Sequence, residues 1–276
     1  MQELIVIKIG GGRGIDLAPL ADEFARLVRS GLRAVLVHGG SHETDLLAEA
    51  LGHPPQRIVS PSGHESRRTD RRTLEIFEMA YCGKVNKGLV ERLRAGGVDA
   101  VGLSGLDGGI WIGSRKDSIR AVMDGRVVIV RDDLSGRVER VDTSLLTFLL
   151  ESGRTPVLTP PAVTPDGTAI NVDADRAAAL TAVALGASEL LLLSNVPGVL
   201  ADASDPESLI TLVDEANLAQ VRDAARGRMK NKVLAAKEAL SGGVRRVVIG
   251  SAQGEDAISK ARAGTGTVFE AAHARA

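Results

Sequence analysis

The sequence has little of what several classes of protein require. Its 276 residues include one cysteine, Cys82, and only 2% aromatic residues. A single cysteine forms neither an internal disulfide nor a multi-cysteine metal site, which favours a reducing compartment. Scarce aromatics leave few surfaces on which nucleobases could stack. Because 34 Lys and Arg are balanced by 35 Asp and Glu, there is also no excess of positive charge to favour a nucleic-acid partner.

Long apolar runs and a leader-like segment are missing as well. No uninterrupted apolar run approaches the ~18 residues that a membrane-spanning helix needs. No basic-then-apolar leader is recognisable at the N-terminus. We therefore expect a cytoplasmic protein with no membrane partner. With 44% hydrophobic residues, the chain can form a substantial core, either as one large α/β domain or as two lobes.

Strand-like and helix-like patterns alternate along most of the chain. Helices are predicted over residues 16–30, 42–51, 69–96, 143–152, 174–185 and 229–240. Strands are predicted over residues 4–9, 34–37, 98–103, 156–159, 190–193 and 246–249, with a last one near Thr267. Such alternation is typical of a mostly parallel sheet covered by helices.

Two features depart from this regular pattern. The long helix over residues 69–96 is expected to kink near Gly83. Residues 110–141 contain short strand-like runs, with turn signals at Asp124-Gly125 and Ser135-Gly136. We expect this segment to form an antiparallel insert at the edge of the parallel sheet.

Two apolar runs near the N-terminus end in glycine turns. They are Lys8-Ile9-Gly10-Gly11-Gly12 and Val37-His38-Gly39-Gly40-Ser41. Glycine lets an anion approach peptide N–H groups closely, and an ammonium beside it stabilises the negative charge. Neither G-x-G-x-x-G nor G-x-x-x-x-G-K-[ST] is present, which argues against a Rossmann dehydrogenase and a P-loop NTPase. A strand-end lysine reaching solvent remains the alternative for Lys8.

Two polar segments later in the chain are candidates for the same chemistry. Asp173 is a good helix N-cap, which leaves Asn171 and Asp175 free to face a ligand. Residues 227–232 place three basic side chains in the first turn of a helix, where cations are unfavourable unless an anion is near. A solvated run of charge is the alternative for this segment.

Phosphoryl transfer accounts for these elements together. A transferring phosphoryl group needs positioning and compensation of its charge rather than covalent chemistry. Lys8 and Lys232 could flank that group while Asp175 holds both lysines in place. Two residues stay open: His38 is either a metal or acid–base residue or a structural one, and Ser41 either bonds the acceptor or caps the next helix.

Five motifs in the same order resemble those of the amino acid kinase family, which includes acetylglutamate kinase. They are Lys8-Ile9-Gly10-Gly11, Val37-His38-Gly39-Gly40, Asn171-Val172-Asp173-Ala174-Asp175, Leu193-Ser194-Asn195-Val196-Pro197-Gly198-Val199-Leu200 and residues 227–232. The resemblance implies an α/β protein, a three-layer α/β/α sandwich around a mostly parallel central sheet. It also implies an N-terminal lobe, residues 1–160, for acceptor binding and dimerisation, and a C-terminal lobe, residues 161–276, for ATP binding.

The same resemblance implies roles for individual residues, with ATP and Mg²⁺ as cofactors and no metal ligand from the protein. The catalytic residues would be Lys8, Lys232 and Asp175. Acceptor binding would involve Gly39, Gly40, Arg67 and Asn171. Nucleotide binding would involve Gly10, Gly11, Ser194, Asn195, Pro197, Gly198 and Leu200.

Further strings are similar to one branch of this family, the kinases of carrier-protein-dependent lysine biosynthesis. They are His38-Gly39-Gly40-Ser41, Gly52-His53-Pro54-Pro55, Ser60-Pro61-Ser62-Gly63-His64, Ser66-Arg67-Arg68-Thr69-Asp70, residues 102–108 and Gly227-Arg228-Met229-Lys230. This implies phosphorylation of the side-chain carboxylate of α-aminoadipate or glutamate carried on the small acidic protein LysW, with a role in arginine biosynthesis left open. It also implies a homodimer, formed through the helix at residues 69–96.

Three alternatives stay open. One is an N-acetylglutamate kinase of arginine biosynthesis, and another is a kinase of the same fold acting on uridylate or carbamate. The third is a non-catalytic nucleotide-binding protein, because one fold hosts many functions.

A cluster of arginines adjoins the predicted acceptor residue Arg67. Arg67, Arg68, Arg71 and Arg72 lie within six residues, with Asp70 as the one acid among them. Such a cluster would steer an acidic carrier toward the site in a salt-sensitive way. An ordinary solvated helix start, partly paired with Asp70 and Glu75, is the alternative.

Overall fold

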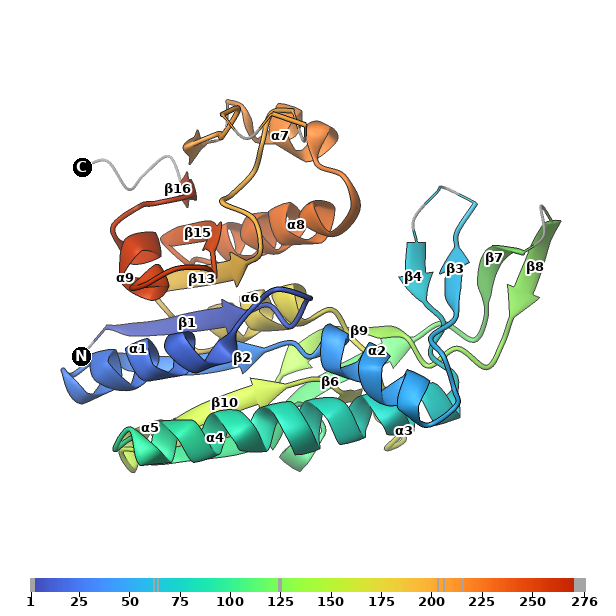
Figure 1. The fold of residues 1–276 in the computed structure, drawn as a ribbon, viewed down its shortest axis with the longest axis horizontal. Coiled ribbons are helices and arrows are strands. Elements are labelled where there is room, and N and C mark those ends of the chain that lie inside the picture. The colour runs from blue at the N-terminus through green and yellow to red at the C-terminus, as the bar shows by residue number, and fades with distance from the viewer. Residues whose placement is uncertain are drawn as a thin grey trace.

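An eight-stranded sheet lies at the centre of the computed structural model (Figure 1), which describes residues 3–270 apart from residues 62, 64, 124, 125, 203, 206 and 215. The strand order is β14-β16-β15-β13-β1-β2-β10-β5, and every neighbouring pair is parallel except β15 with β16. The strands are β1 (Leu4–Ile9), β2 (Arg33–His38), β5 (Ala100–Ser104), β10 (Thr155–Thr159), β13 (Glu189–Ser194), β14 (Leu212–Val213), β15 (Arg246–Ser251) and β16 (Thr267–Glu270).

Helices cover both faces of this sheet. One face carries α1 (Leu17–Arg29), α4 (Asn86–Ala95) and α9 (Ala257–Arg262), and the other carries α5 (Ser144–Glu151), α6 (Ala174–Ala184) and α8 (Gly227–Ser241). Successive residues of β1 serve opposite faces, since Ile5 and Ile7 pack with α1 whereas Val6 packs with α6 and α8. Strands buried on both faces read as continuous apolar runs. The predicted three-layer α/β/α sandwich is confirmed.

The first strand lies between the two halves of the chain. It pairs with β2 on one side and with β13 on the other. In open α/β sheets, ligands bind beyond the carboxyl ends of the strands where the strand order reverses. One sheet runs through both predicted lobes, so the lobe boundary near residue 160 stays a prediction.

The long helix predicted over residues 69–96 is present but is not α-helical throughout. It consists of α3 (Arg71–Glu78), a π-helical turn at Met79–Val85, and α4. Asp70 caps its start by accepting a hydrogen bond from Thr73 N at 2.8 Å. The π turn includes Gly83, where the kink was expected. Turns of this kind are frequent at functional sites.

The placement predicted for residues 110–141 is wrong, because these strands form two sheets separate from the central one. One contains β6 (Trp111–Arg115), β9 (Gly136–Val141), β11 (Ala162–Val163) and β12 (Ala169–Ile170). The other, here called the arm, contains β3 (Arg57–Val59), β4 (Glu65–Arg67), β7 (Ile119–Met123) and β8 (Arg126–Val130). All pairings within these two sheets are antiparallel except that of β6 with β11. The arm extends beyond the carboxyl ends of the central strands (Figure 1). Pairing of β3 with β7 joins segments about 60 residues apart, for which local patterns give no signal.

The hairpin predicted around Asp124-Gly125 is confirmed by its strands, because β7 and β8 pair antiparallel with Met123 opposite Arg126. The two turn residues themselves lie outside the described residues. The turn predicted at Ser135-Gly136 is wrong. Gly136 begins β9, and Ser135 forms a bridge with Asn171 instead of turning the chain back on itself. The remaining helices are α2 (Ser41–Ala50), α7 (Leu218–Ala224) and a short 3₁₀ turn at Asp107–Gly109. Within the described part of the chain, none of the helices combines the length and apolar character needed to cross a membrane.

A buried carboxylate joins the first helix to the last. Glu23, on α1, is only 2% exposed and accepts hydrogen bonds from Ile258 N at 2.9 Å and Ser259 N at 2.7 Å. These N–H groups belong to the first turn of α9 and have no partner within the helix. Glu23 therefore fixes α9 against α1 on one face of the sheet.

Replacing this carboxylate should destabilise the fold. Glu23→Gln keeps one acceptor oxygen but sets an NH₂ group against the other N–H, so we expect a loss of about 1–3 kcal/mol in the free energy of unfolding. Chemical denaturation would measure it. Asp22→Asn is the matched control, because Asp22 forms only an exposed ion pair with Arg92 and its loss should be much smaller. Equal losses in the two variants would contradict the capping role.

Candidate active site

Two lysines and one aspartate from distant parts of the chain meet near the carboxyl end of β1. Asp175 Oδ1 lies 2.5 Å from Lys8 Nζ, and Asp175 Oδ2 lies 2.8 Å from Lys232 Nζ. Each of the three side chains is less than a tenth exposed. The predicted convergence of these three residues is confirmed. The alternative of a solvent-directed Lys8 is wrong.

Local structure explains how these side chains reach one another. Lys8 is the second-last residue of β1, and Asp175 lies in the first turn of α6. Asp173 caps α6 as predicted, with Oδ1 accepting from Asp175 N and Arg176 N at 3.0 Å. Its other oxygen accepts from Asn231 Nδ2, on α8, at 2.8 Å. Asn231, the neighbour of Lys232 in the chain, is thus hydrogen-bonded to Asp173, the N-cap of the helix that carries Asp175.

A second link joins the same two helices. Arg176 donates two hydrogen bonds to Glu238 on α8, at 3.0 and 2.6 Å. A bidentate pair restricts orientation as well as distance. Together with Asn231, it keeps α6 and α8 in a fixed register, and so keeps Asp175 beside Lys232.

The charges of the triad do not cancel. Burial alone would raise the pKa of Asp175, but Lys232 and Lys8 together hold it below its ordinary value. At Lys232, burial lowers the pKa and outweighs the opposing attraction of Asp175. Two ammonium groups around one carboxylate leave a buried excess of positive charge. Such an excess is costly in the absence of an anion and favourable in its presence.

The two glycine turns pack directly against each other. A Cβ atom on Gly11 would lie 2.1 Å from both Gly39 C and Gly40 N, so no side chain fits at this position. Ser41 Oγ donates to Gly11 O at 3.1 Å, and His42 N donates to the same oxygen at 2.9 Å. Ser41 thus joins the two turns and does not cap α2, whose N-cap is Gly40.

Of the predicted acceptor side chains, Arg67 contacts the residue that follows the second of these turns, and Asn171 contacts Thr69, two residues after Arg67. Arg67 Nη2 donates to Ser41 O at 3.1 Å and pairs with Asp45 at 2.5 Å. Asn171 Nδ2 donates to Thr69 Oγ1 at 3.2 Å. The N–H of Gly39 is already bonded to Ile9 O at 3.0 Å. The N–H of Gly39 is therefore already used within the protein. Gly40 is the glycine of the pair that lies at the amino end of α2.

Sequence reasoning missed Tyr81, an aromatic residue beside this turn. Its ring covers Gly40, where an added Cβ would lie 2.9 Å from Tyr81 Cδ2, and it stacks on Phe77 with 3.8 Å between ring centroids. Burial raises the pKa of Tyr81, and the nearby Gly40 N–H and Arg67 act in the opposite direction. An aromatic residue on an apolar helix face gives no signal in the sequence that separates it from the core.

The predicted nucleotide residues follow the carboxyl end of β13. Gly10 N donates to Leu193 O at 2.8 Å, which sets the first glycine turn beside this loop. Ser194 is 4% exposed, and within the described residues its hydroxyl has no hydrogen-bond partner. Asn195 and Pro197 are exposed. A buried hydroxyl without a partner is unusual in a folded protein and fits a site that binds a polar ligand.

Two further nucleotide candidates have structural contacts. A Cβ on Gly198 would lie 2.6 Å from Thr267 Oγ1, which accepts from Val199 N at 2.8 Å. Leu200 forms a bridge with Leu209. These contacts explain the glycine by packing, so the nucleotide role of both residues stays a prediction.

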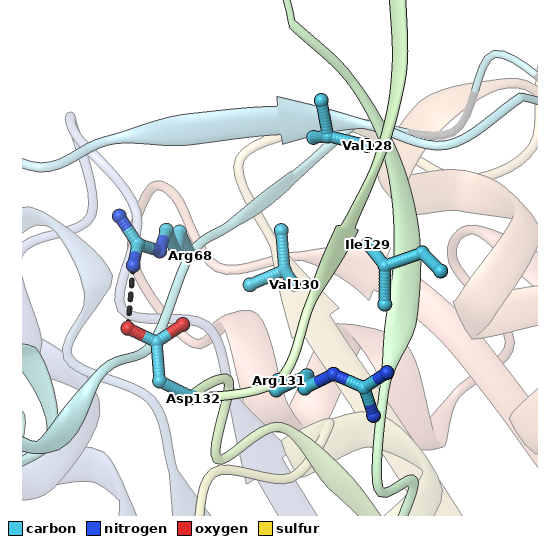
Figure 2. Close-up of a pocket in the computed structure, with 6 residues that line it drawn as sticks. All are labelled: Arg68, Val128, Ile129, Val130, Arg131 and Asp132. Atoms are coloured by element: carbon cyan, nitrogen blue, oxygen red, sulfur yellow. Dashed lines mark hydrogen bonds and ion pairs between the residues drawn. The ribbon is translucent and has the colours of Figure 1, made fainter.

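Most of the arginine cluster is engaged in ion pairs. Besides the Arg67 pair, Arg68 pairs with Asp132 at 2.5 Å and Arg72 pairs with Glu75 at 3.3 Å. Figure 2 shows the Arg68 pair in a hollow formed with residues 128–132. The pair of Arg72 with Glu75 agrees with the alternative that this segment is an ordinary solvated helix start. Arg71 is exposed. A docking role for the cluster stays a prediction.

The site offers no cage of protein ligands for a metal. Across residues 3–270, less the seven positions left undescribed, no group of three or more His, Cys, Asp or Glu side chains could hold a metal ion. Mg²⁺ usually keeps several waters and binds through one or two carboxylates together with substrate phosphates. A magnesium ion brought in by the phosphates of a nucleotide is compatible with this arrangement.

Comparisons with known proteins agree with the geometry. The model of the amino acid kinase family matches residues 3–251. A [LysW]-aminoadipate kinase of Deinococcus radiodurans is 56% identical, over 96% of this chain and 91% of that protein. A [LysW]-aminoadipate kinase of Thermus thermophilus is 49% identical, over 96% of this chain and 99% of that protein. The structure of carbamate kinase from Giardia lamblia bound to AMP-PNP, 15% identical, superposes with a TM-score of 0.70 over 98% of each chain, which supports the fold.

The triad makes a prediction about stability and pH. Asp175→Asn leaves two buried ammonium groups without their carboxylate, so we expect a loss of about 3–5 kcal/mol in the free energy of unfolding near pH 7. The pKa of Asp175 is lower in the folded protein than its ordinary value of 3.8. Its contribution is therefore complete above that value and is lost as the pH falls toward the folded pKa. Denaturation at several pH values should show a smaller acid-induced loss for Asp175→Asn than for the wild type, and parallel losses would contradict this.

Proposed function

The chain belongs to the amino acid kinase family, and we propose that it transfers the γ-phosphoryl group of ATP to the side-chain carboxylate of α-aminoadipate carried on LysW, in lysine biosynthesis. One observation carries the chemistry: the carboxylate of Asp175 bridges the buried ammonium groups of Lys8 and Lys232. The names of the two relatives above support the substrate. Glutamate on the same carrier is the second acceptor to be tested.

The triad suits the charge that develops during such a transfer. A carboxylate oxygen of the acceptor bonds to the γ-phosphorus, the bond to the bridging oxygen of ADP breaks, and an acyl phosphate forms. In the transition state the negative charge is spread over the phosphoryl oxygens, and fixed positive groups stabilise it without reorganising. Lys8 and Lys232 would supply these groups. Asp175 would keep the two lysines in place, leaving one positive charge uncompensated for the phosphoryl group.

The remaining residues divide between the two substrates. Gly10, Gly11 and Ser194 would contact the nucleotide. For Ser194 the support is its hydroxyl, which lacks a protein partner in the described structure. Gly40, Arg67 and Asn171 would contact the acceptor. Mg²⁺ would be held by the phosphates of ATP. The proposal keeps an acceptor lobe at residues 1–160 and an ATP lobe at residues 161–276, with Gly10 and Gly11 of the first lobe also contacting the nucleotide and Asn171 of the second also contacting the acceptor.

The proposed partners are the acidic carrier protein and a second copy of the chain. On the arm, β8 exposes Val127 by 59% and Ile129 by 60%, and exposed Arg131 follows the strand. Figure 2 shows Ile129 and Arg131 extending from the opposite side of β8 to the Arg68 ion pair. An apolar surface bordered by arginines is complementary to an acidic protein. A homodimer along the helix of residues 71–95 is supported by Met79, which is 49% exposed.

The activity can be tested with purified chain, ATP, magnesium and the carrier conjugate, by trapping the acyl phosphate as a hydroxamate. We expect turnover of carrier-bound α-aminoadipate and none of free N-acetylglutamate. Lys8→Ala and Lys232→Ala should each lower kcat at least ~100-fold, because each removes a positive group from the transition state. Lys237→Ala, an exposed lysine further along α8, is the matched control. Near-normal turnover in either variant would remove that lysine from the mechanism, and turnover of the free acetyl compound would assign the acetylglutamate reaction.

The docking role of the arginine cluster predicts a selective effect on the carrier. Arg71→Glu with Arg72→Glu should raise the KM for the carrier conjugate by roughly tenfold and weaken its salt dependence, with the KM for ATP unchanged. Arg29→Glu with Arg245→Glu is the control pair, because both residues lie near the amino-terminal ends of the central strands. Steady-state kinetics at several salt concentrations would measure both effects. Equal changes in the two KM values, or the same effect from the control pair, would argue against docking at this cluster.

A further inference from the structure

One buried polar group next to the acceptor turn has no part in the proposed chemistry. His38 is the last residue of β2 and is fully buried. Its Nδ1 lies 3.1 Å from Gly39 O, and its Nε2 lies 3.0 Å from Asn86 Nδ2 at the start of α4. The imidazole therefore bridges the glycine turn and the long helix.

The neighbours of Asn86 fix which way its amide faces. Asn86 Nδ2 also lies 3.0 Å from Val157 O, and Asn86 Oδ1 lies 3.3 Å from Lys87 Nζ. A backbone carbonyl can only accept a hydrogen bond and an ammonium can only donate one. The NH₂ group of Asn86 must therefore face Val157 and His38, and its oxygen must face Lys87.

This orientation determines the tautomer of His38. Because Asn86 donates to Nε2, that nitrogen carries no proton, and the proton of the neutral ring is on Nδ1, where it is donated to Gly39 O. Burial lowers the pKa of His38 to about 4, with Lys8 and Lys87 acting in the same direction against the Gly39 carbonyl. The ring is neutral near pH 7. The acid–base alternative for His38 is not supported.

The Gly39 carbonyl belongs to the peptide that precedes the N–H of Gly40. In a trans peptide, C=O and N–H lie in one rigid plane and point in opposite directions. Fixing the carbonyl on His38 therefore fixes the direction of the Gly40 N–H as well. Gly11 lies against the same peptide plane, since its Cβ would meet Gly39 C and Gly40 N.

We propose that His38 is a positioning residue: as the Nδ1–H tautomer set by Asn86, it orients the Gly39–Gly40 peptide, whose Gly40 N–H lies beside the Tyr81 hydroxyl, and so shapes the turn that receives the acceptor carboxylate. This inference rests on the proposed function in one respect, the binding of the acceptor at Gly40. The π-helical turn contributes to the arrangement. Tyr81 and Asn86 are five residues apart, which is the spacing of π-helical hydrogen bonds. This spacing places Tyr81 over Gly40 and Asn86 against His38.

Kinetics of two His38 variants test the positioning role. His38→Leu removes the donor, and we expect the KM for the carrier conjugate to rise at least tenfold while the KM for ATP stays within about twofold. His38→Asn places an amide N–H where Nδ1–H stood, and it should keep the acceptor KM within about threefold of the wild type. If the two variants are equally impaired, or if both KM values rise together, His38 only fills space and the inference fails.

A matched control separates positioning from general loss of packing. Thr159 is fully buried, and its Oγ1 donates to the backbone carbonyl of His38 at 3.2 Å. Thr159→Val should lower the unfolding temperature without changing the acceptor KM. A rise in acceptor KM equal to that of His38→Leu would overturn the assignment to the imidazole.

The tautomer is measurable without any substrate. In protein labelled with ¹⁵N-histidine, the His38 resonances, identified by their loss in His38→Asn, should show a protonated Nδ1 and an unprotonated Nε2 near pH 7. Asn86→Asp replaces the donor by an acceptor, so Nε2 should become protonated in that variant. A wild-type ring protonated at Nε2 would overturn the inference.

These readouts keep the two proposals apart. If the wild type does not use the carrier conjugate, the proposed function fails, and the KM comparison is made with the acceptor that it does use. If the carrier conjugate is used but His38→Leu binds it normally, the inference fails and the proposed function stands.

Discussion

The placement of one carboxylate between two buried ammonium groups is the constraint on which the rest of this structure depends. Burying two positive charges around a single aspartate costs free energy that a well-packed apolar core would not. The strand order makes the arrangement achievable, because β1 lies between β2 and β13 and brings Lys8 to the helices of the second half. The hydrogen bonds from Asn231 and Arg176 then keep α6 and α8 together. This uncompensated charge is what suits a kinase of this family to an anionic phosphoryl group.

The glycine turns impose a second constraint, which comes from missing side chains. Gly11 and the Gly39–Gly40 peptide approach so closely that a single methyl group on Gly11 would collide with the neighbouring backbone. Ser41 secures this contact by donating to Gly11 O. The residues expected at the nucleotide and those expected at the acceptor therefore belong to one packed unit, and a phosphoryl group has a short path between them.

Much of this arrangement follows from the sequence. The parts that could not be predicted have one physical reason in common. Apolar periodicity located the central strands and their helices, and helix-capping chemistry identified Asp173. The convergence of Lys8, Lys232 and Asp175 was predicted from the charge that phosphoryl transfer must compensate and from the resemblance carried by the five motifs. Periodicity describes one segment at a time, however, so the pairing of β3 with β7 in the arm could not be predicted. The contacts of Tyr81 with Gly40, and of Asn86 with His38, were missed because each depends on the register of a π turn that no local pattern specifies.

The two faces of the central sheet have separate tasks in this arrangement. The triad is held from one face, where α6 and α8 are bonded to each other. The acceptor turn is held from the other, where Asn86 begins α4 and Tyr81 lies in the π turn before it. In the proposed homodimer this long helix also faces the second copy. A shift of the helix would therefore alter the Gly39–Gly40 peptide, and with it acceptor binding, while the lysines that stabilise the phosphoryl group keep their geometry.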